Sequence, residues 1–238
     1  MPASPTFSAS KAEAVRTMFT RIARRYDLMN SLMTGGRHHA WRRRVADTAA
    51  GAPSGPVLDL ATGTADLAIA VGARTPGRFV AGADFSEGML RVGQAKLRAR
   101  GVTRLQLLVA DAQALPFRDG AFACVMSAFL LRNLEDLERG LAEMRRVTVR
   151  GGRVVTLDIV RPAQPLWGKA FGAYFNHVVP AIGAFVAGDR QAYTYLPQSV
   201  DRFVTPDELS ELMEKVGLRD VTYRRFGLGT IALHVGTA

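Results

Sequence analysis

This 238-residue sequence is poor in cysteine, in acidic charge and in long apolar runs. Its single cysteine, Cys124, excludes a disulfide within the chain, and the surrounding apolar segment AFACVMSAFLL predicts a buried thiol. No segment approaches the ~20 uninterrupted apolar residues of a membrane-spanning helix. The N-terminal MPASPTFSASKAEAV also lacks the apolar core of a signal peptide. We therefore expect a cytoplasmic protein that folds as one domain over residues 1–238.

Acidic residues are outnumbered, with 21 Asp and Glu against 31 Lys and Arg, which leaves a net charge of +10. Two interpretations stay open. The excess of positive charge either forms a solvated, Arg-rich surface or attracts the protein to an anionic membrane surface. Nucleic acid is disfavoured as a partner, because the basic runs at 42–44, 145–146 and 224–225 are short and are not interleaved with aromatic residues.

Two common nucleotide-binding fingerprints are also missing, namely G-x-G-x-x-G and the phosphate-binding G-x-x-x-x-G-K-[ST]. The sequence has instead PVLDLATGTADL, an apolar strand that ends at Asp59 and runs into a turn containing Gly63 and Thr64. Two later apolar runs end at Asp84 and Asp111. This order is typical of a nucleotide-binding βαβ unit whose ligand lacks phosphates.

In such a unit the backbone passes close to the ligand at the small residues, and a carboxylate at the end of the second strand accepts hydrogen bonds from ribose hydroxyls. We therefore expect Asp59 and Gly63 to line the crevice and Asp84 to bind the ribose. For Asp59 the alternative is a structural role, in which its carboxylate bonds backbone amides at the strand end.

Strand and helix patterns alternate through most of the chain. This alternation with short connections predicts a parallel sheet covered by helices on both faces, with all strand ends that bind ligand on one side. We expect strands at 56–60, 78–84, 104–110, 121–129 and 153–160, helices near 64–74, 86–100, 135–149 and 206–216, and a closing strand pair in 219–238.

Two segments lie outside this alternation. Within about 1–50, apolar residues from Val15 to Tyr26 follow a 3-4-3 spacing, which predicts an amphipathic helical cap over the ligand cleft. The aromatic-rich insertion at about 162–200 is interrupted by three prolines. It is either a helical pair packed on the sheet edge or an apolar lid over a hydrophobic acceptor.

Seven stretches follow one another along the chain: VRTMFTRIARRYDLMNSLMTGG with the following WRRR, VLDLATGTADLA, ADFSEGMLRVGQAKL, DAQALPF, AFLLRNLEDLERGLAEMRRV, GDRQAYTYLPQSV and IALHVG. Through these stretches, from about residue 15 to 236, the sequence resembles the bacterial demethylmenaquinone and ubiquinone biosynthesis C-methyltransferases, a class I family that depends on S-adenosylmethionine. The resemblance implies a Rossmann-like α/β fold with a mostly parallel seven-stranded sheet, S-adenosylmethionine as cofactor, and a polyprenylated demethylmenaquinol as methyl acceptor.

The resemblance also implies cofactor contacts at Thr64 in the turn, at Asp84 beside the ribose, and at Asp111 and Ala112 beside the adenine. A helix cap is the alternative for the Thr64 hydroxyl. Ala65 stands where the family usually has glycine. We expect its methyl group to press on the methionine part of the cofactor or to shift the turn.

Arg132 and Asn133 are implied on the acceptor side. Methylation of a ring carbon requires a deprotonated quinol, but an arginine is a poor base because its pKa stays above ~12. We therefore predict that Arg132 stabilises the phenolate and that Asn133 orients the ring oxygen or a water. The alternative is a structural ion pair of Arg132 with Glu135 or Asp136.

For several further residues the sequence leaves two roles open. Tyr26 either closes over the acceptor or packs in the core. Asp158 either faces the acceptor or caps its strand, and His177 is either a general base or, as we prefer, a packed histidine. His38 and His39 are predicted to lie on the surface. No histidine spacing suits a metal, so we expect no metal site.

The predicted function is therefore conversion of demethylmenaquinol to menaquinol by a cytoplasmic enzyme peripheral to the inner face of the membrane. A C- or O-methyltransferase for another isoprenoid or polyketide acceptor is an alternative, favoured if Leu130, which replaces a family glycine, reshapes the pocket. A cofactor-binding protein without turnover and an RNA methyltransferase are further alternatives. The sequence leaves open whether the protein forms a homodimer.

Overall fold

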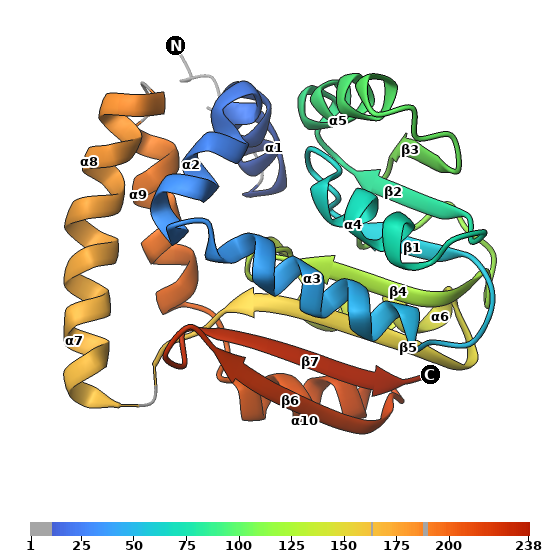
Figure 1. Cartoon of the computed structure of the whole chain (residues 1–238). Coiled ribbons are helices and arrows are strands. Elements are labelled where there is room, and N and C mark those ends of the chain that lie inside the picture. The colour runs from blue at the N-terminus through green and yellow to red at the C-terminus, as the bar shows by residue number, and fades with distance from the viewer. Residues whose placement is uncertain (1–10, 163, 188–189) are drawn as a thin grey trace, which may run out of the picture.

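A seven-stranded sheet in the order β3-β2-β1-β4-β5-β7-β6 forms the centre of the molecule (Figure 1). The computed structural model describes residues 11–162, 164–187 and 190–238. Strands β1 to β5 pair in parallel, and β7 runs antiparallel between β5 and β6. The strands are β1 (Val57–Leu60), β2 (Val80–Asp84), β3 (Leu105–Val109), β4 (Phe122–Ala128), β5 (Thr148–Ile159), β6 (Arg219–Phe226) and β7 (Ile231–Thr237).

Helices cover both faces of this sheet. One apolar cluster joins α3, α4 and α5 to one face, and a second joins α6 and α10 to the other. These helices are α3 (Arg37–Ala50), α4 (Asp66–Arg74), α5 (Glu87–Ala99), α6 (Leu137–Arg146) and α10 (Pro206–Lys215). The mostly parallel, seven-stranded α/β fold expected from the sequence is confirmed, and Cys124 is buried and free as predicted.

The remaining helices gather beyond one end of the sheet (Figure 1). A third apolar cluster packs the N-terminal helices against the insertion, with Met29, Phe175 and Val179 among its buried members. These elements are α1 (Lys11–Ile22), η1 (Ala23–Arg25), α2 (Tyr26–Thr34), α7 (Pro165–Ala173), η3 (Tyr174–Val178), α8 (Val179–Ile182), η4 (Gly183–Ala187) and α9 (Arg190–Asp201). Positions 1–10 of the predicted cap and 163, 188 and 189 of the predicted insertion lie outside the described residues.

Strand β5 begins five residues earlier than the sequence suggested, at Thr148 in place of 153. The pairing of β4 with β5 shifts register between Phe122 and Cys124. Gly152 makes this irregularity possible, because a Cβ there would lie 2.8 Å from the carbonyl oxygen of Ala123. Gly151 and Gly152 thus lie within β5, where the shift in register marks a bulge.

The ligand crevice is set by the connection of the strands. The chain moves outward from β1 through β2 to β3 on one side and from β4 to β5 on the other, so β1 and β4 flank a topological switch point. Ala61, Ala65 and Phe129, which follow these two strands, have positive φ angles of 55°, 66° and 65°. Such backbone conformations are costly for residues other than glycine and collect at functional sites.

Candidate active site

Two cavities adjoin each other at the switch point. One, of about 660 Å³, lies over the ends of β1, β2 and β3. The other, of about 420 Å³, lies between the sheet, the N-terminal helices and the insertion. Four of the described residues line both cavities and form the wall between them: Phe19, Tyr26, Phe129 and Asn133.

The larger cavity contains the strand-end acids that the sequence singled out. Asp84 Oδ2 accepts a hydrogen bond from the Gly63 amide at 2.8 Å, and Asp84 Oδ1 accepts one from the Ser86 amide at 2.9 Å. Burial raises the pKa of Asp84 to about 6, although these amides oppose the shift. The carboxylate is therefore held rigidly at the end of β2, facing the cavity.

Asp111 and Ala112 line the same cavity, next to apolar Val109 and opposite Leu130. Asp111 Oδ1 accepts a hydrogen bond from the Gln113 amide at 2.9 Å, which fixes the turn after β3. Such a slot, with apolar walls and a polar edge, fits a flat heterocycle. Leu130 was expected near the acceptor, but it lines this cavity and not the apolar one.

The charges of the larger cavity favour a cationic ligand without phosphates. Its lining includes four acidic residues, Glu13, Asp84, Asp111 and Glu135, and among the described residues one basic residue, Arg16. The positive sulfonium and the uncharged ribose of S-adenosylmethionine suit this lining, whereas a pyrophosphate would meet repulsion. The residues present therefore fit this cofactor.

Asp59 and Thr64 do not line either cavity. Asp59 Oδ2 accepts a hydrogen bond from Thr62 Oγ1 at 2.7 Å, and burial raises the pKa of Asp59 to about 7. Thr64 Oγ1 donates to Asp27 Oδ1 at 2.7 Å. Both side chains thus hold the turn after β1 in place, and direct cofactor contacts from them stay predictions.

Thr64 belongs to an ionic cluster that ties the N-terminal helices to the turn. Lys96 Nζ lies 2.5 Å from Asp27 Oδ2, 2.6 Å from Asp66 Oδ1 and 3.0 Å from Thr64 Oγ1. Arg42 Nη1 lies 2.8 Å from Asp66 Oδ2. Burial favours the neutral form of Asp66, but Lys96 and Arg42 outweigh it and hold the pKa of that carboxyl below its usual value.

Ala65 turns its methyl group away from the cavities. It is buried in the cluster formed by α4 and α5, and a Cβ built on Gly93 would lie 3.2 Å from the Ala65 Cβ. The expectation that this methyl presses on the methionine part of the cofactor is therefore not supported by its position. It packs against α5.

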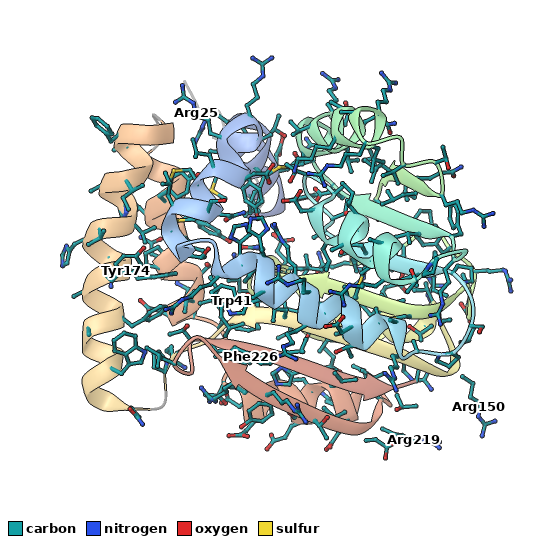
Figure 2. All side chains as sticks on the ribbon, viewed as in Figure 1. Arg25, Trp41, Arg150, Tyr174, Arg219 and Phe226 are labelled. Carbon is teal, nitrogen blue, oxygen red and sulfur yellow. The ribbon has the colours of Figure 1, made fainter. Side chains whose placement is uncertain are left out.

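The smaller cavity is lined mostly by aromatic and aliphatic side chains from the N-terminal helices and the insertion. Figure 2 labels Trp41 on α3 and Tyr174 on the insertion, both of which line it. The Tyr174 hydroxyl donates to the Met33 carbonyl oxygen at 2.8 Å, which joins the insertion to α2. The insertion therefore closes an apolar cavity.

The three predicted catalytic residues, Tyr26, Arg132 and Asn133, all line this apolar cavity. Arg132 Nη1 lies 2.5 Å from Asp158 Oδ1, and both side chains are almost fully buried. The sequence suggested Glu135 or Asp136 as ion-pair partners, but the partner is Asp158. Asp136 instead caps α6 through the Arg139 amide.

Asn133 is held from two sides. Its Nδ2 donates to the Phe129 carbonyl oxygen at 3.0 Å, and its Oδ1 accepts from the Tyr195 hydroxyl at 3.2 Å. Burial raises the pKa of Tyr195, so the phenol stays protonated and able to donate. Sequence reasoning did not single out Tyr195, although it lies in the family-like stretch GDRQAYTYLPQSV.

Two histidine predictions were wrong. His38 was placed on the surface, but it is 1% exposed and lines the apolar cavity, while His39 is exposed as expected. His177, read as a packed residue or a general base, is exposed and lines neither cavity. Among the described residues, no three His, Cys, Asp or Glu side chains are grouped to hold a metal ion.

Comparison with known proteins agrees with this geometry. Residues 7–238 match the model of the ubiE/COQ5 methyltransferase family. A demethylmenaquinone methyltransferase of Thermus thermophilus is 44% identical over 92% of this chain and 99% of its own length. A ubiquinone/menaquinone biosynthesis C-methyltransferase of Desulfotalea psychrophila is 41% identical over 97% of this chain and 92% of its own.

The fold has solved counterparts as well. The crystal structure of a SAM-dependent methyltransferase from Aquifex aeolicus superposes with a TM-score of 0.63 at 16% identity, covering 88% of this chain and 96% of that one. At this identity the likeness concerns the fold. None of the helices in the described part of the chain is long and apolar enough to cross a membrane. The full-length match and the close relatives show that the chain belongs to the ubiE/COQ5 methyltransferase family.

Proposed function

We propose that this protein is an S-adenosylmethionine-dependent C-methyltransferase that converts demethylmenaquinol to menaquinol. The observation that carries the proposal is the pair of adjoining cavities, one acidic and one apolar, which share a wall formed by Phe19, Tyr26, Phe129 and Asn133. A nucleoside cofactor in the first and a hydrophobic ring in the second would meet at this wall. The names of the relatives from Thermus and Desulfotalea support the same reaction.

On the cofactor side, Asp84 would accept the ribose hydroxyls, and Asp111 with Ala112 would border the adenine. The Gly63 amide already bonds the Asp84 carboxylate and keeps it aimed at the cavity. S-adenosylmethionine supplies an electrophilic methyl group on its sulfonium. The acidic residues of this lining stabilise the positive charge of the bound cofactor.

On the acceptor side, the residues have to exclude water, orient the ring and stabilise a phenolate. Loss of the hydroxyl proton to solvent water would push electron density onto the adjacent ring carbon, which would take the methyl group as the bond from that methyl group to sulfur breaks. Loss of that carbon's own hydrogen as a proton would then restore the aromatic quinol. Arg132 remains a cation and stabilises the phenolate oxygen, while Asp158 fixes the direction of its guanidinium. Asn133, held by Tyr195, orients the ring oxygen, and Tyr26 closes the wall beside it.

We also propose peripheral contact with the inner membrane surface, where a polyprenyl tail resides. Four large apolar side chains near the apolar cavity's helices are exposed, Leu28 at 52%, Leu32 at 47%, Val178 at 43% and Phe185 at 93%, and the chain carries a net charge of +10. Flotation with vesicles containing anionic lipid tests this. Binding that is weakened by Phe185→Ser and by salt supports it, and no flotation at low salt contradicts it.

The function itself is tested by calorimetric titration with S-adenosylmethionine and S-adenosylhomocysteine, followed by methyl transfer to a reduced short-chain demethylmenaquinol. We expect both ligands to bind and the ring to be methylated. Arg132→Lys should leave cofactor binding intact but slow transfer by about 10²-fold, since a lysine cannot keep the planar guanidinium geometry. Lysine at the exposed Arg224 is the matched control. Cofactor binding without transfer would contradict the proposed acceptor.

A further inference from the structure

His38 is a buried polar residue in an apolar cavity, and nothing described so far uses it. It lies in the first turn of α3, is 1% exposed, and lines the proposed acceptor cavity. Its Nε2 atom is buried and has no hydrogen-bond partner among the described residues. A buried polar atom without a partner costs stability, and a ligand bound in the adjoining cavity would supply the missing partner.

The protonation state of the ring follows from Thr34. Thr34 Oγ1 lies 2.7 Å from the Asn30 carbonyl oxygen and 2.9 Å from His38 Nδ1. A hydroxyl has one hydrogen and a carbonyl oxygen can only accept, so the hydrogen of Thr34 is directed to Asn30. Nδ1 must then be the donor to Thr34, which leaves Nε2 with a free lone pair.

Burial and the neighbouring charges keep the imidazole ring of His38 neutral. Burial, followed by Arg42 and His39, lowers the pKa of His38 to about 4, against the weaker opposing effects of Asp66 and Asp27. At neutral pH the imidazole therefore carries no charge. Nε2 can accept a hydrogen bond there but cannot donate one.

We propose that His38 Nε2 accepts the hydrogen bond of the quinol hydroxyl and thereby makes the cavity selective for the reduced ring over the oxidised quinone. This inference rests on the proposed function, because it takes the acceptor in the cavity to be a quinol. A quinone presents a carbonyl oxygen at the same place. Two lone pairs would then face each other in a site with little water, and neither could be satisfied.

This selectivity serves the reaction. The oxidised ring has no hydroxyl proton to lose and its carbon is not nucleophilic, so bound quinone would occupy the cavity without product. Asn30 offers a useful contrast, because its Nδ2 also lines the cavity, is buried, and has no partner in the described part of the chain. An amide donor bonds a hydroxyl oxygen and a carbonyl oxygen alike, so it gives affinity but not discrimination.

The test compares the affinities for 1,4-dihydroxynaphthalene, kept reduced under anaerobic conditions, and for 1,4-naphthoquinone. Both tryptophans of the protein, Trp41 and Trp167, line the cavity, so quenching of intrinsic fluorescence reports binding without turnover. We expect the wild type to bind the reduced probe at least about tenfold more tightly. His38→Asn removes the acceptor at the Nε2 position and should bring the ratio of the affinities for the reduced and the oxidised probe to within about twofold of unity.

Two control variants isolate the effect. His177→Asn changes an exposed histidine that lines neither cavity and should leave the ratio of the two affinities as in the wild type. Asn30→Leu should weaken both probes by a similar factor and so preserve the ratio. Titration with S-adenosylhomocysteine, whose cavity His38 does not line, shows that each variant is folded.

An unchanged ratio in folded His38→Asn would overturn the inference, as would equal affinity of the wild type for the two probes. In both cases the probes still bind, so the proposed acceptor cavity would stand. Failure of the wild type to bind either probe would overturn the proposed acceptor itself, and the inference with it.

Discussion

Arg132 and Asp158 form a buried ion pair, with Arg132 Nη1 2.5 Å from Asp158 Oδ1 and side-chain exposures of 6% and 2%. The pair links the turn after β4 to the end of the neighbouring strand β5. Asp158 Oδ1 also accepts a hydrogen bond from the Ile159 amide at 2.8 Å, so the carboxylate is fixed before it meets the arginine. The arginine that faces the acceptor cavity is thus oriented by the adjacent strand.

The first prediction concerns the two roles of this pair. Asp158→Leu leaves a buried guanidinium without its partner and should lower the free energy of unfolding by about 3–5 kcal/mol. The double variant Arg132→Met with Asp158→Leu removes both charges and should regain most of that stability without regaining methyl transfer. Urea denaturation and a transfer assay check this. A double variant that is as unstable as the single one, or that is active, would contradict it.

The second prediction concerns Lys96, which bridges Asp27 of the N-terminal helices and Asp66 of α4. Lys96→Met removes the cation that both carboxylates contact, while Asp66 keeps Arg42, and should lower the free energy of unfolding by about 1–3 kcal/mol, the partial exposure of Asp27 limiting the loss. It should also weaken cofactor binding, because Thr64 in the turn shares the cluster.

Arg91→Met is the matched control on the same helix. Arg91 pairs with Glu87 on the exposed face of α5, where such pairs contribute about 0.5 kcal/mol or less. Thermal unfolding and calorimetry of the two variants make the comparison. Equal losses from Lys96→Met and Arg91→Met would mean that the cluster does not hold the N-terminal helices to the turn.

The third prediction is a pH dependence of cofactor binding. Burial raises the pKa of Asp84 to about 6, and only the ionised carboxylate can accept both ribose hydroxyls. Affinity should therefore be full above pH ~6.5 and fall roughly tenfold for each pH unit below 6. Calorimetry with S-adenosylhomocysteine from pH 5 to 8 measures this. Asp84→Asn should bind weakly at every pH, and a variant that keeps the wild-type profile would remove Asp84 from the site.

The fourth prediction corrects an expectation from the sequence. Ala65 has φ 66°, so Ala65→Gly relieves about 1–2 kcal/mol of backbone strain in the folded state. Against this, the variant loses a buried methyl group worth about 0.8 kcal/mol, and the greater backbone freedom of glycine stabilises the unfolded chain by about 0.4–1 kcal/mol. Stability should change by less than about 1 kcal/mol, and cofactor affinity by less than about twofold. A gain of tenfold in affinity would place the methyl against the cofactor after all.

The strands and the strand-end acids could be read from the sequence because both are local signals. Apolar runs that end at Asp59 and Asp84 place β1 and β2 within about two residues of their observed bounds. The start of β5 was missed because the Gly151 and Gly152 pair is ambiguous between a turn and a bulge until the pairing with β4 is known.

The contacts of the site could not be read in the same way, because they depend on which elements become neighbours. Glu135 and Asp136 are nearest to Arg132 in sequence, but the pairing of β4 with β5 brings Asp158 to it from 26 residues away. His38 lies in the polar run RHHAWRRR, and it is buried where α3 meets the insertion around the cavity. Thr34, four residues before His38, is its hydrogen-bond partner, and this spacing was the feature of the sequence that could have indicated a buried His38.

Analysis of the reaction product shows whether the protein methylates a ring carbon of the quinol. The protein is incubated anaerobically with S-adenosylmethionine and a short-chain demethylmenaquinol, and the product is examined by mass spectrometry and proton NMR. We expect one added methyl group on the ring carbon next to a hydroxyl, with loss of the ring hydrogen signal at that position. A methyl group on oxygen, or unchanged quinol beside bound cofactor, would contradict it.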